Sequence, residues 1–137
     1  MLPARTYSVS IDRPPEVLYA AIWQPDFFPN WASGLAQSTL RQDGEVWIAD
    51  GPDGRSSVRF TPHNTFGVMD HDVHTADGIV VHVPLRVVAN GDGSEVMLTL
   101  FRQPGVSDEK FSADAKWIVR DLRRLKALIE GKTMSRT

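Results

Sequence analysis

Residues 69–87 read MDHDVHTADGIVVHVPLRV, and this pattern predicts a β-hairpin around the turn signal Ala76-Asp77-Gly78. Side chains alternate between the two faces of a strand, so the length of the loop decides which residues share a face. A three-residue loop pairs Asp72 with His82 and creates one nearly apolar face. That face carries Met69, His71, Val73, Ile79, Val81, Val83, Leu85 and Val87. A two-residue loop would mix charged residues with the valines, so we favour the three-residue loop.

Turn signals on both sides of this hairpin extend the apolar face into an antiparallel meander. A loop of two or four residues around residues 91–92 places Leu85 opposite Leu98. An odd-length loop around Pro52 adds two more residues to the same face, Val46 and Ile48. Since each hairpin continues one apolar face, the meander is better supported than any single strand.

His71 is the polar residue on the predicted apolar face. A loop at residues 63–64 places it opposite Ser56, and a buried imidazole needs a partner of this kind. The first interpretation is a core histidine that Ser56 or a trapped water satisfies. The second is a group that donates to a ligand carbonyl or acts as an acid or base. No third residue that would orient the imidazole can be identified, which argues against a hydrolase. His71 is therefore the one weak catalytic candidate.

The closing segment, residues 108–130, predicts one long amphipathic helix. Its apolar residues recur at helical spacing and are Phe111, Ala115, Ile118, Leu122, Leu125 and Ile129. At 1.5 Å per residue this helix would be roughly 34 Å long, and Gly131 is expected to stop it. Near the N-terminus a strand is expected at residues 6–11, and Pro15 and Pro25 lie where two short helices would begin.

This order of elements predicts an α+β fold. Because the helix and the sheet must each bury an apolar face, we expect a curved seven-stranded antiparallel sheet around the long C-terminal helix, with two short helices after the first strand. Such an arrangement leaves space for a ligand between sheet and helix, and core packing is the alternative role of the residues there. The predicted lining comprises Trp31, Ser56, Phe60, Met69, His71, Val83, Leu98, Ile118 and Leu122.

The composition restricts the class of protein. The chain has 137 residues and a net charge of −2, which predicts a single domain over residues 1–137, with the segment 132–137 as a flexible tail. The absence of Cys excludes thiol chemistry and Cys-based zinc sites. His71 and His74 would point to opposite faces of a strand, so we expect no metal, and no other cofactor either. Without a membrane span or a signal-peptide core, we expect a cytoplasmic protein.

The end of the long helix is basic, with Arg120, Arg123, Arg124 and Lys126. The helix dipole favours cations near a C-terminus, so a solvated face is the main interpretation of this cluster. No aromatic ladder or phosphate-binding glycine loop accompanies it, and we expect no nucleic acid partner. Trp117 lies off the apolar stripe, and Trp47 is expected on the strand face opposite Val46 and Ile48; both are expected to be half exposed.

Several segments resemble known proteins. YSVSIDRPPEVLYAAI (7–22), DFFPNWASGL (26–35) and the closing DEKFSADAKWIVRDLRRLKALIEG (108–131) resemble the START/Bet v 1-like superfamily, also called SRPBCC. FGVMDHDVH (66–74) and VPLRVVANGDGSEVMLTLFRQPG (83–105) are similar to small bacterial polyketide cyclase/dehydrase-like members. The resemblance implies a helix-grip fold with a cavity between the curved sheet and the last helix. Relatives bind lipids, steroids, hormones or polyketides, or act as cyclases or chaperone activators, and no catalytic set carries over residue by residue.

The function expected from these observations is the binding of a small hydrophobic or aromatic molecule. A polyketide cyclase or dehydratase is the first alternative, since positioning an unstable polyketide needs only a shaped apolar cavity and one or two polar groups such as His71. A protein-interaction domain like the chaperone activators is the second alternative. The sequence is also compatible with a homodimer.

Overall fold

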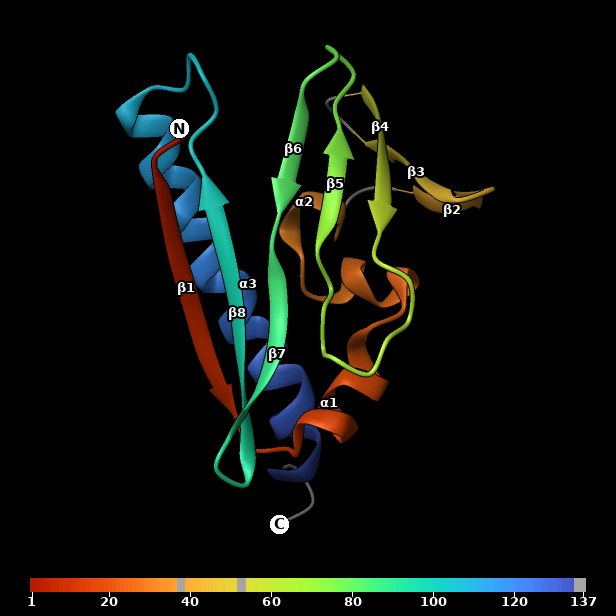
Figure 1. Cartoon of the computed structure of the whole chain (residues 1–137), viewed down its shortest axis with the longest axis vertical. Helices are drawn as coiled ribbons and strands as arrows, with labels where there is room; N and C mark the ends of the chain where they lie inside the picture. The colour runs from red at the N-terminus through yellow and green to blue at the C-terminus, as the bar shows by residue number, and fades with distance from the viewer. Residues whose placement is uncertain (37–38, 52–53, 135–137) are drawn as a thin grey trace.

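The computed structural model describes residues 1–36, 39–51 and 54–134, which form two antiparallel sheets and a long C-terminal helix (Figure 1). The first sheet has the order β1-β8-β7 and consists of β1 (Ala4–Ile11), β8 (Gly93–Phe101) and β7 (Leu85–Asn90). The second runs in sequence order and consists of β2 (Thr39–Asp43), β3 (Val46–Gly51), β4 (Gly54–Phe60), β5 (His71–His74) and β6 (Val80–Val83).

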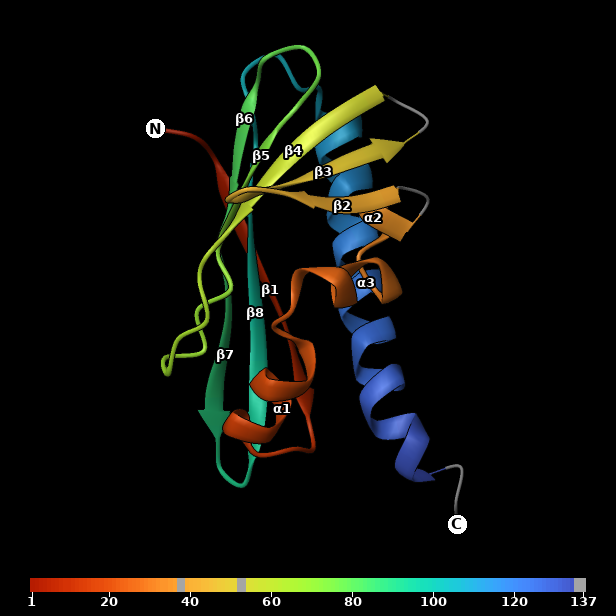
Figure 2. The same cartoon turned by 90° about the vertical axis from the view of Figure 1, so that its right-hand side faces the viewer.

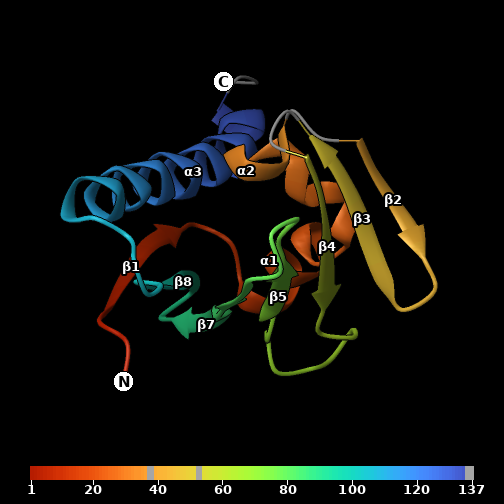
Figure 3. The same cartoon turned by 90° about the horizontal axis from the view of Figure 1, so that it is seen from above.

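The helical segments lie on one side of the two sheets (Figures 2 and 3). They are α1 (Pro15–Ile22), the 3₁₀ helix η1 (Pro25–Asn30), α2 (Ser33–Ala36) and α3 (Asp108–Met134). Pro15 and Pro25 each occupy the first turn of a helix, where a missing N–H costs no hydrogen bond. The two short helices expected after the first strand are therefore three segments, because the second one is divided into the 3₁₀ helix η1 and the separate helix α2.

The helix α3 buries the apolar stripe predicted for it. Phe111, Ala115, Leu122 and Leu125 are buried, and Ile118 and Ile129 pack against the same core. The predicted end of the helix at Gly131 is wrong, since α3 continues through this residue to Met134. A glycine inside a helix costs only about 1 kcal/mol relative to Ala, so it does not have to stop one. The remainder of the predicted tail, residues 135–137, lies outside the described residues.

The structure has eight strands within the described ranges where the sequence predicts seven, because one predicted strand is interrupted at Pro84. Proline has no N–H to donate to a ladder, and the chain passes here from β6 to β7, and so from one sheet to the other. Asp70 bridges the interruption. Its carboxylate accepts hydrogen bonds from the Leu85 N–H at 2.9 Å and from two nitrogens of Arg86, at 3.1 and 2.8 Å.

Two predicted strand registers are confirmed. Asp72 pairs with His82 across a three-residue loop, and the two side chains interact on the outer face. Leu85 pairs with Leu98, as expected from the turn at residues 91–92. Both pairs flank tight turns, whose geometry fixes the register of the strands that they join.

The predicted pairing of His71 with Ser56 is wrong, because His71 pairs with Phe60. The two strands are joined by a ten-residue loop, 61–70, and not by a tight turn at residues 63–64. Asn64 organises this loop: its Oδ1 accepts hydrogen bonds from the N–H groups of Phe66 and Val68, and its Nδ2 donates to the Val68 carbonyl. The shift in register is even, so His71 still faces the side of the sheet on which α3 lies.

The predicted odd-length loop around Pro52 is also wrong. Gly51 pairs with Gly54, so the strands are separated by an even number of residues, and Trp47 pairs with Val58. A change of one residue exchanges the two faces of a strand. Trp47 and the buried Ala49 therefore share the inner face with Val58, whereas Val46 and Ile48 do not.

Candidate functional site

The residues predicted to line a cavity under α3 lie mostly within the packed interior. Trp31, Met69 and Leu122 are each no more than 4% exposed. The partly buried Phe60, Leu98 and Ile118 pack against the same core, and Ser56, His71 and Val83 are partly buried on the five-stranded sheet. These positions place core side chains where the sequence predicted open space. Their contact with a ligand stays a prediction.

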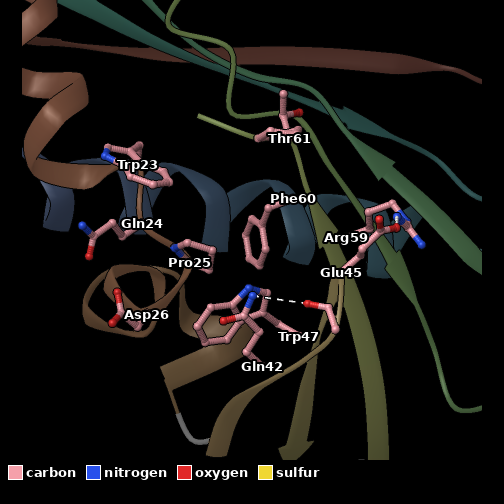
Figure 4. A pocket seen from close by; sticks show the side chains of 12 residues that line it. Trp23, Gln24, Pro25, Asp26, Gln42, Glu45, Trp47, Arg59, Phe60 and Thr61 are labelled. Atoms are coloured by element: carbon pink, nitrogen blue, oxygen red, sulfur yellow. Dashed lines mark hydrogen bonds and ion pairs between the residues drawn. The ribbon is translucent and has the colours of Figure 1, made fainter. Parts of the chain in front are cut away.

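A cleft of about 650 Å³ opens instead at the edge of this interior (Figure 4). One wall is the segment that joins α1 to η1, and the other is the outer part of the five-stranded sheet. Its lining is Trp23, Gln24, Pro25, Asp26, Gln42, Gly44, Glu45, Trp47, Arg59, Phe60, Thr61 and Pro62. Phe60 is the one member of the predicted lining that this cleft includes among the described residues.

Three aromatic side chains give the cleft its apolar surface. Phe60 on β4 and Trp47 on β3 point toward Pro25 across the cleft (Figure 4), because both belong to the inner face of the sheet. Trp23 follows α1 and packs against His63, with ring centroids 4.6 Å apart. His63 also contacts Tyr19, at 5.4 Å. These contacts fix Trp23 against α1 and against the loop 61–70.

Polar groups lie around the aromatic surface. The Arg59 guanidinium donates to the Glu45 carboxylate at 3.0 Å, and the Gln42 amide donates to the Gly44 carbonyl at 3.2 Å. Asp26 has no hydrogen-bond or ion-pair partner among the residues that the structure describes. The cleft therefore offers an unengaged carboxylate and the remaining donors of Arg59 and Gln42 to a polar group of a ligand.

His71 lies behind Phe60, further inside the molecule. The His71 ring is 5.4 Å from the Phe60 ring and 5.5 Å from that of Phe28, measured between centroids. Burial lowers the pKa of His71, so the neutral imidazole is favoured. Its Nδ1 lies 3.1 Å from the Met69 carbonyl, which can only accept, so Nδ1 carries the proton and Nε2 is the basic nitrogen. Nε2 has no hydrogen-bond partner among the described residues.

Apart from Phe60, the lining of the cleft was not predicted from the sequence, and its two tryptophans, Trp23 and Trp47, show why. Trp47 was placed on the wrong face by the register at Pro52, and an even loop length there would have identified it. No periodicity signals Trp23, because it follows the last residue of α1 and is positioned by contacts with His63 from the distant loop.

The structure gives no indication of a metal centre or a membrane span in its described parts. No cluster of three His, Cys, Asp or Glu side chains in residues 1–36, 39–51 and 54–134 has a geometry that could hold a metal ion. Within the same ranges, no helix combines the length and the apolar character needed to cross a bilayer.

Solved structures share this fold at low sequence identity. XoxI from Bacillus cereus is 20% identical and superposes with a TM-score of 0.72 over 93% of this chain and 95% of its own. The Aha1 dimer from Colwellia psychrerythraea is 14% identical and superposes with a TM-score of 0.68 over 92% of this chain and 95% of its own. Ara h 8.0201 is 12% identical and superposes with a TM-score of 0.64 over 96% of this chain and 99% of its own. No protein-family model and no curated protein sequence matches the chain. The chain thus has the START/Bet v 1-like helix-grip fold predicted from its sequence.

Proposed function

We propose that this protein binds a small aromatic or hydrophobic molecule, carrying one or two polar groups, in the cleft formed by Trp23, Trp47 and Phe60. The observation that carries the proposal is the meeting of three aromatic side chains in a space of about 650 Å³. Pockets for small molecules commonly have volumes of roughly 300 to 1,000 Å³ and mainly apolar walls with a few polar groups. The ligand would stack on the aromatic surface and direct its polar group to Asp26 or Arg59.

The proposed ligand position differs from the one predicted from the sequence: it lies in the cleft at the edge of the five-stranded sheet, and not in the space between the sheet and α3. The centre is occupied by core side chains such as Trp31 and Met69. We also propose that the chain acts as a single domain in the cytoplasm. The fold-level resemblance to ligand-binding relatives supports the class of ligand, and the aromatic cleft supports the position.

An enzyme of the cyclase or dehydratase type is the second candidate, and the free Nε2 of His71 favours it. A neutral imidazole with one open nitrogen suits an acid–base role near neutral pH. His71 does not line the cleft, however, and its ring is 5.4 Å from that of Phe60, so a substrate in the cleft contacts Phe60 and not His71. Binding therefore has the more direct support.

A protein-interaction domain is the third candidate. Phe66, at the tip of the loop 61–70, is 80% exposed, and Val17 and Val88 are exposed as well. An exposed apolar rim of this kind is typical of interaction surfaces. If this candidate is right, a partner protein, and not a small molecule, covers Phe66 and shields it from solvent.

Titration of the protein with the neutral fluorescent dye Nile red tests the proposal. We expect a dissociation constant in the micromolar range, about −8 kcal/mol, and at least a five-fold weakening for Phe60→Ala and for Trp47→Ala. Trp117→Ala is the matched control, since Trp117 is a half-exposed tryptophan outside the cleft. Unchanged binding in both cleft variants, with intact circular dichroism, would overturn the proposed position. Native mass spectrometry of protein from its own host would then identify the class of any retained ligand.

A further inference from the structure

The cations of this protein fall into two groups. On the two sheets and at the ends of α3, most of them pair with a carboxylate, as Arg55 on β4 does with Asp50 and Arg86 on β7 with Asp70. Five others have no carboxylate within 4.0 Å among the described residues, and they gather where α3 faces β1 and α2: Arg5, Lys116, Arg120, Arg123 and Arg124. The net charge of the chain is −2, so this concentration of unpaired positive charge is local.

Three of these cations, Arg120, Arg123 and Arg124, border a pocket of about 450 Å³ between α3 and the segment Trp31–Ser33. Its lining is Trp31, Ser33, Trp117, Arg120, Asp121, Arg123 and Arg124. The helix α2 lies beside α3 at this place (Figures 2 and 3), and the Asp121 carboxylate links the two helices by accepting hydrogen bonds from the Ser33 N–H and hydroxyl, at 3.2 and 3.1 Å. The pocket is separate from the aromatic cleft, with which it shares no described residue.

Two of the three arginines in this pocket are held in place by other groups. The Arg120 guanidinium lies over the Trp117 ring, 5.0 Å from its centroid. Arg124 donates from Nε to the Asn30 carbonyl at 3.0 Å, which leaves its two terminal nitrogens without a partner among the described residues. Fixed guanidinium groups lose little conformational freedom when they bind an oxyanion, and they can bind it in a bidentate manner.

We propose that this pocket binds the phosphate group of a small phosphate monoester. Three arginines and Asp121 give the lining a formal charge of +2, which matches the charge of about −2 that a phosphate monoester carries near neutral pH. Asp121 does not neutralise the arginines by direct contact, because its hydrogen bonds go to Ser33. Trp117 is 51% exposed and provides an apolar surface for the organic part of the ligand.

A small molecule fits these observations better than a polyanion. Nucleic acid binding draws on a basic surface that extends over many phosphates, whereas the overall charge of this chain is negative. The arginines here line one pocket next to a tryptophan ring, and this ring restrains Arg120. The proposal is independent of the ligand in the aromatic cleft.

Isothermal titration of the full chain with phenyl phosphate tests this site, with phenylacetate, phenol and inorganic phosphate as comparison ligands. We expect saturable binding of phenyl phosphate that is at least ten-fold tighter than that of phenylacetate or phenol, and weaker binding of inorganic phosphate. Arg123→Gln should weaken phenyl phosphate binding at least ten-fold and leave the fold intact, because Arg123 is exposed and makes no hydrogen bond, ion pair or ring contact with the described residues. Arg120→Gln should have a comparable effect.

Arg41→Gln is the matched control, since it removes one exposed cation from the five-stranded sheet. We expect it to change phenyl phosphate binding less than two-fold. Nile red binding should be the same in Arg123→Gln as in the unaltered protein, which separates this site from the aromatic cleft. Equal binding of phenyl phosphate by Arg123→Gln and Arg41→Gln would overturn the proposal, as would phenylacetate binding as tight as that of phenyl phosphate.

Discussion

The two sheets of this protein differ in how completely their inner faces are covered. In the three-stranded sheet, Leu85 and Val96 are fully buried against α1 and α3, together with Ile11. In the five-stranded sheet, Trp47, Phe60 and His71 are only partly buried, although they occupy equivalent inward positions. Of the two sheets, the first thus contributes more residues to the buried core, while the second retains an incompletely covered aromatic surface. Function in this fold is therefore expected on the second sheet.

The connections between strands account for part of this difference. The turn between β7 and β8 is tight, with Asn90 paired to Gly93. Between β4 and β5 the chain makes the ten-residue loop 61–70. This loop turns away from its own sheet and bonds to β7, through Met69 N–H to the Leu85 carbonyl and Val87 N–H to the Gly67 carbonyl. Phe60 at its start is left beside the cleft.

The largest effect should come from removing a core side chain beneath α3. Leu122 is 2% exposed, so Leu122→Ala should lower the free energy of unfolding by about 2 to 5 kcal/mol. Trp47→Ala should cost clearly less, since part of the Trp47 side chain is already exposed to water. Urea denaturation of both variants measures the contrast. Equal losses would show that the two sheets are covered to the same extent.

The sequence predicted those parts of the fold in which local turn chemistry sets the register. Asp77-Gly78 fixed the pairing of Asp72 with His82, and the apolar stripe of α3 was evident from its spacing. One of the two wrong registers arose where the loop is governed by other contacts. The side-chain hydrogen bonds of Asn64 organise a long loop that resembles a short turn in sequence. At Pro52, the predicted loop length was wrong by one residue, and this error assigned Trp47 to the wrong face of the strand.

The candidate site was less predictable than the fold for the same reason. A cleft at the edge of the sheet depends on one-residue differences in register and on contacts between distant segments, such as Trp23 with His63. Side-chain volumes decide whether the space under α3 stays open, and the sequence pattern does not reveal this. Trp31 and Met69 illustrate the point, because both were expected to border a cavity and both are buried in the core.

The next largest effect is expected at the contact between the long loop and β7. Gly67 has a φ of +70°, and a Cβ there would lie 2.2 Å from the Val87 carbonyl oxygen. Gly67→Ala should therefore destabilise the protein by more than the roughly 1 to 2 kcal/mol that a left-handed conformation alone costs. Gly91→Ala is the control, since Gly91 has a φ of +57° but a Cβ added there would meet no atom within 4 Å. Similar thermal unfolding of the two variants would contradict a tight loop–strand contact.

A smaller effect is expected at the junction of the two sheets. Burial alone would raise the pKa of Asp70, but hydrogen bonds from Arg86 and the Leu85 N–H outweigh it and lower the pKa. The carboxylate thus stabilises the fold above the unfolded-state pKa of about 3.9, and this contribution is lost as the pH falls through the lower folded-state value. Asp70→Asn should cost about 1.5 kcal/mol at pH 7. The difference from the unaltered protein should shrink in acid, as measured by urea denaturation between pH 7 and pH 3.

The smallest effect is expected from His71, on the incompletely covered sheet. Burial lowers its pKa in the folded protein, so the neutral form stabilises the fold fully above the unfolded-state pKa of about 6.5. This contribution decreases as the pH falls below that value, because the unfolded chain then binds a proton that the folded protein excludes. Between pH 7 and pH 6 the loss is at most about 0.7 kcal/mol. His71→Phe should remove this component of the pH dependence, whereas His74→Phe, at an exposed position, should keep it. A pH profile of stability that is unchanged in His71→Phe would show that the imidazole is hydrated in the folded protein and open to the cleft.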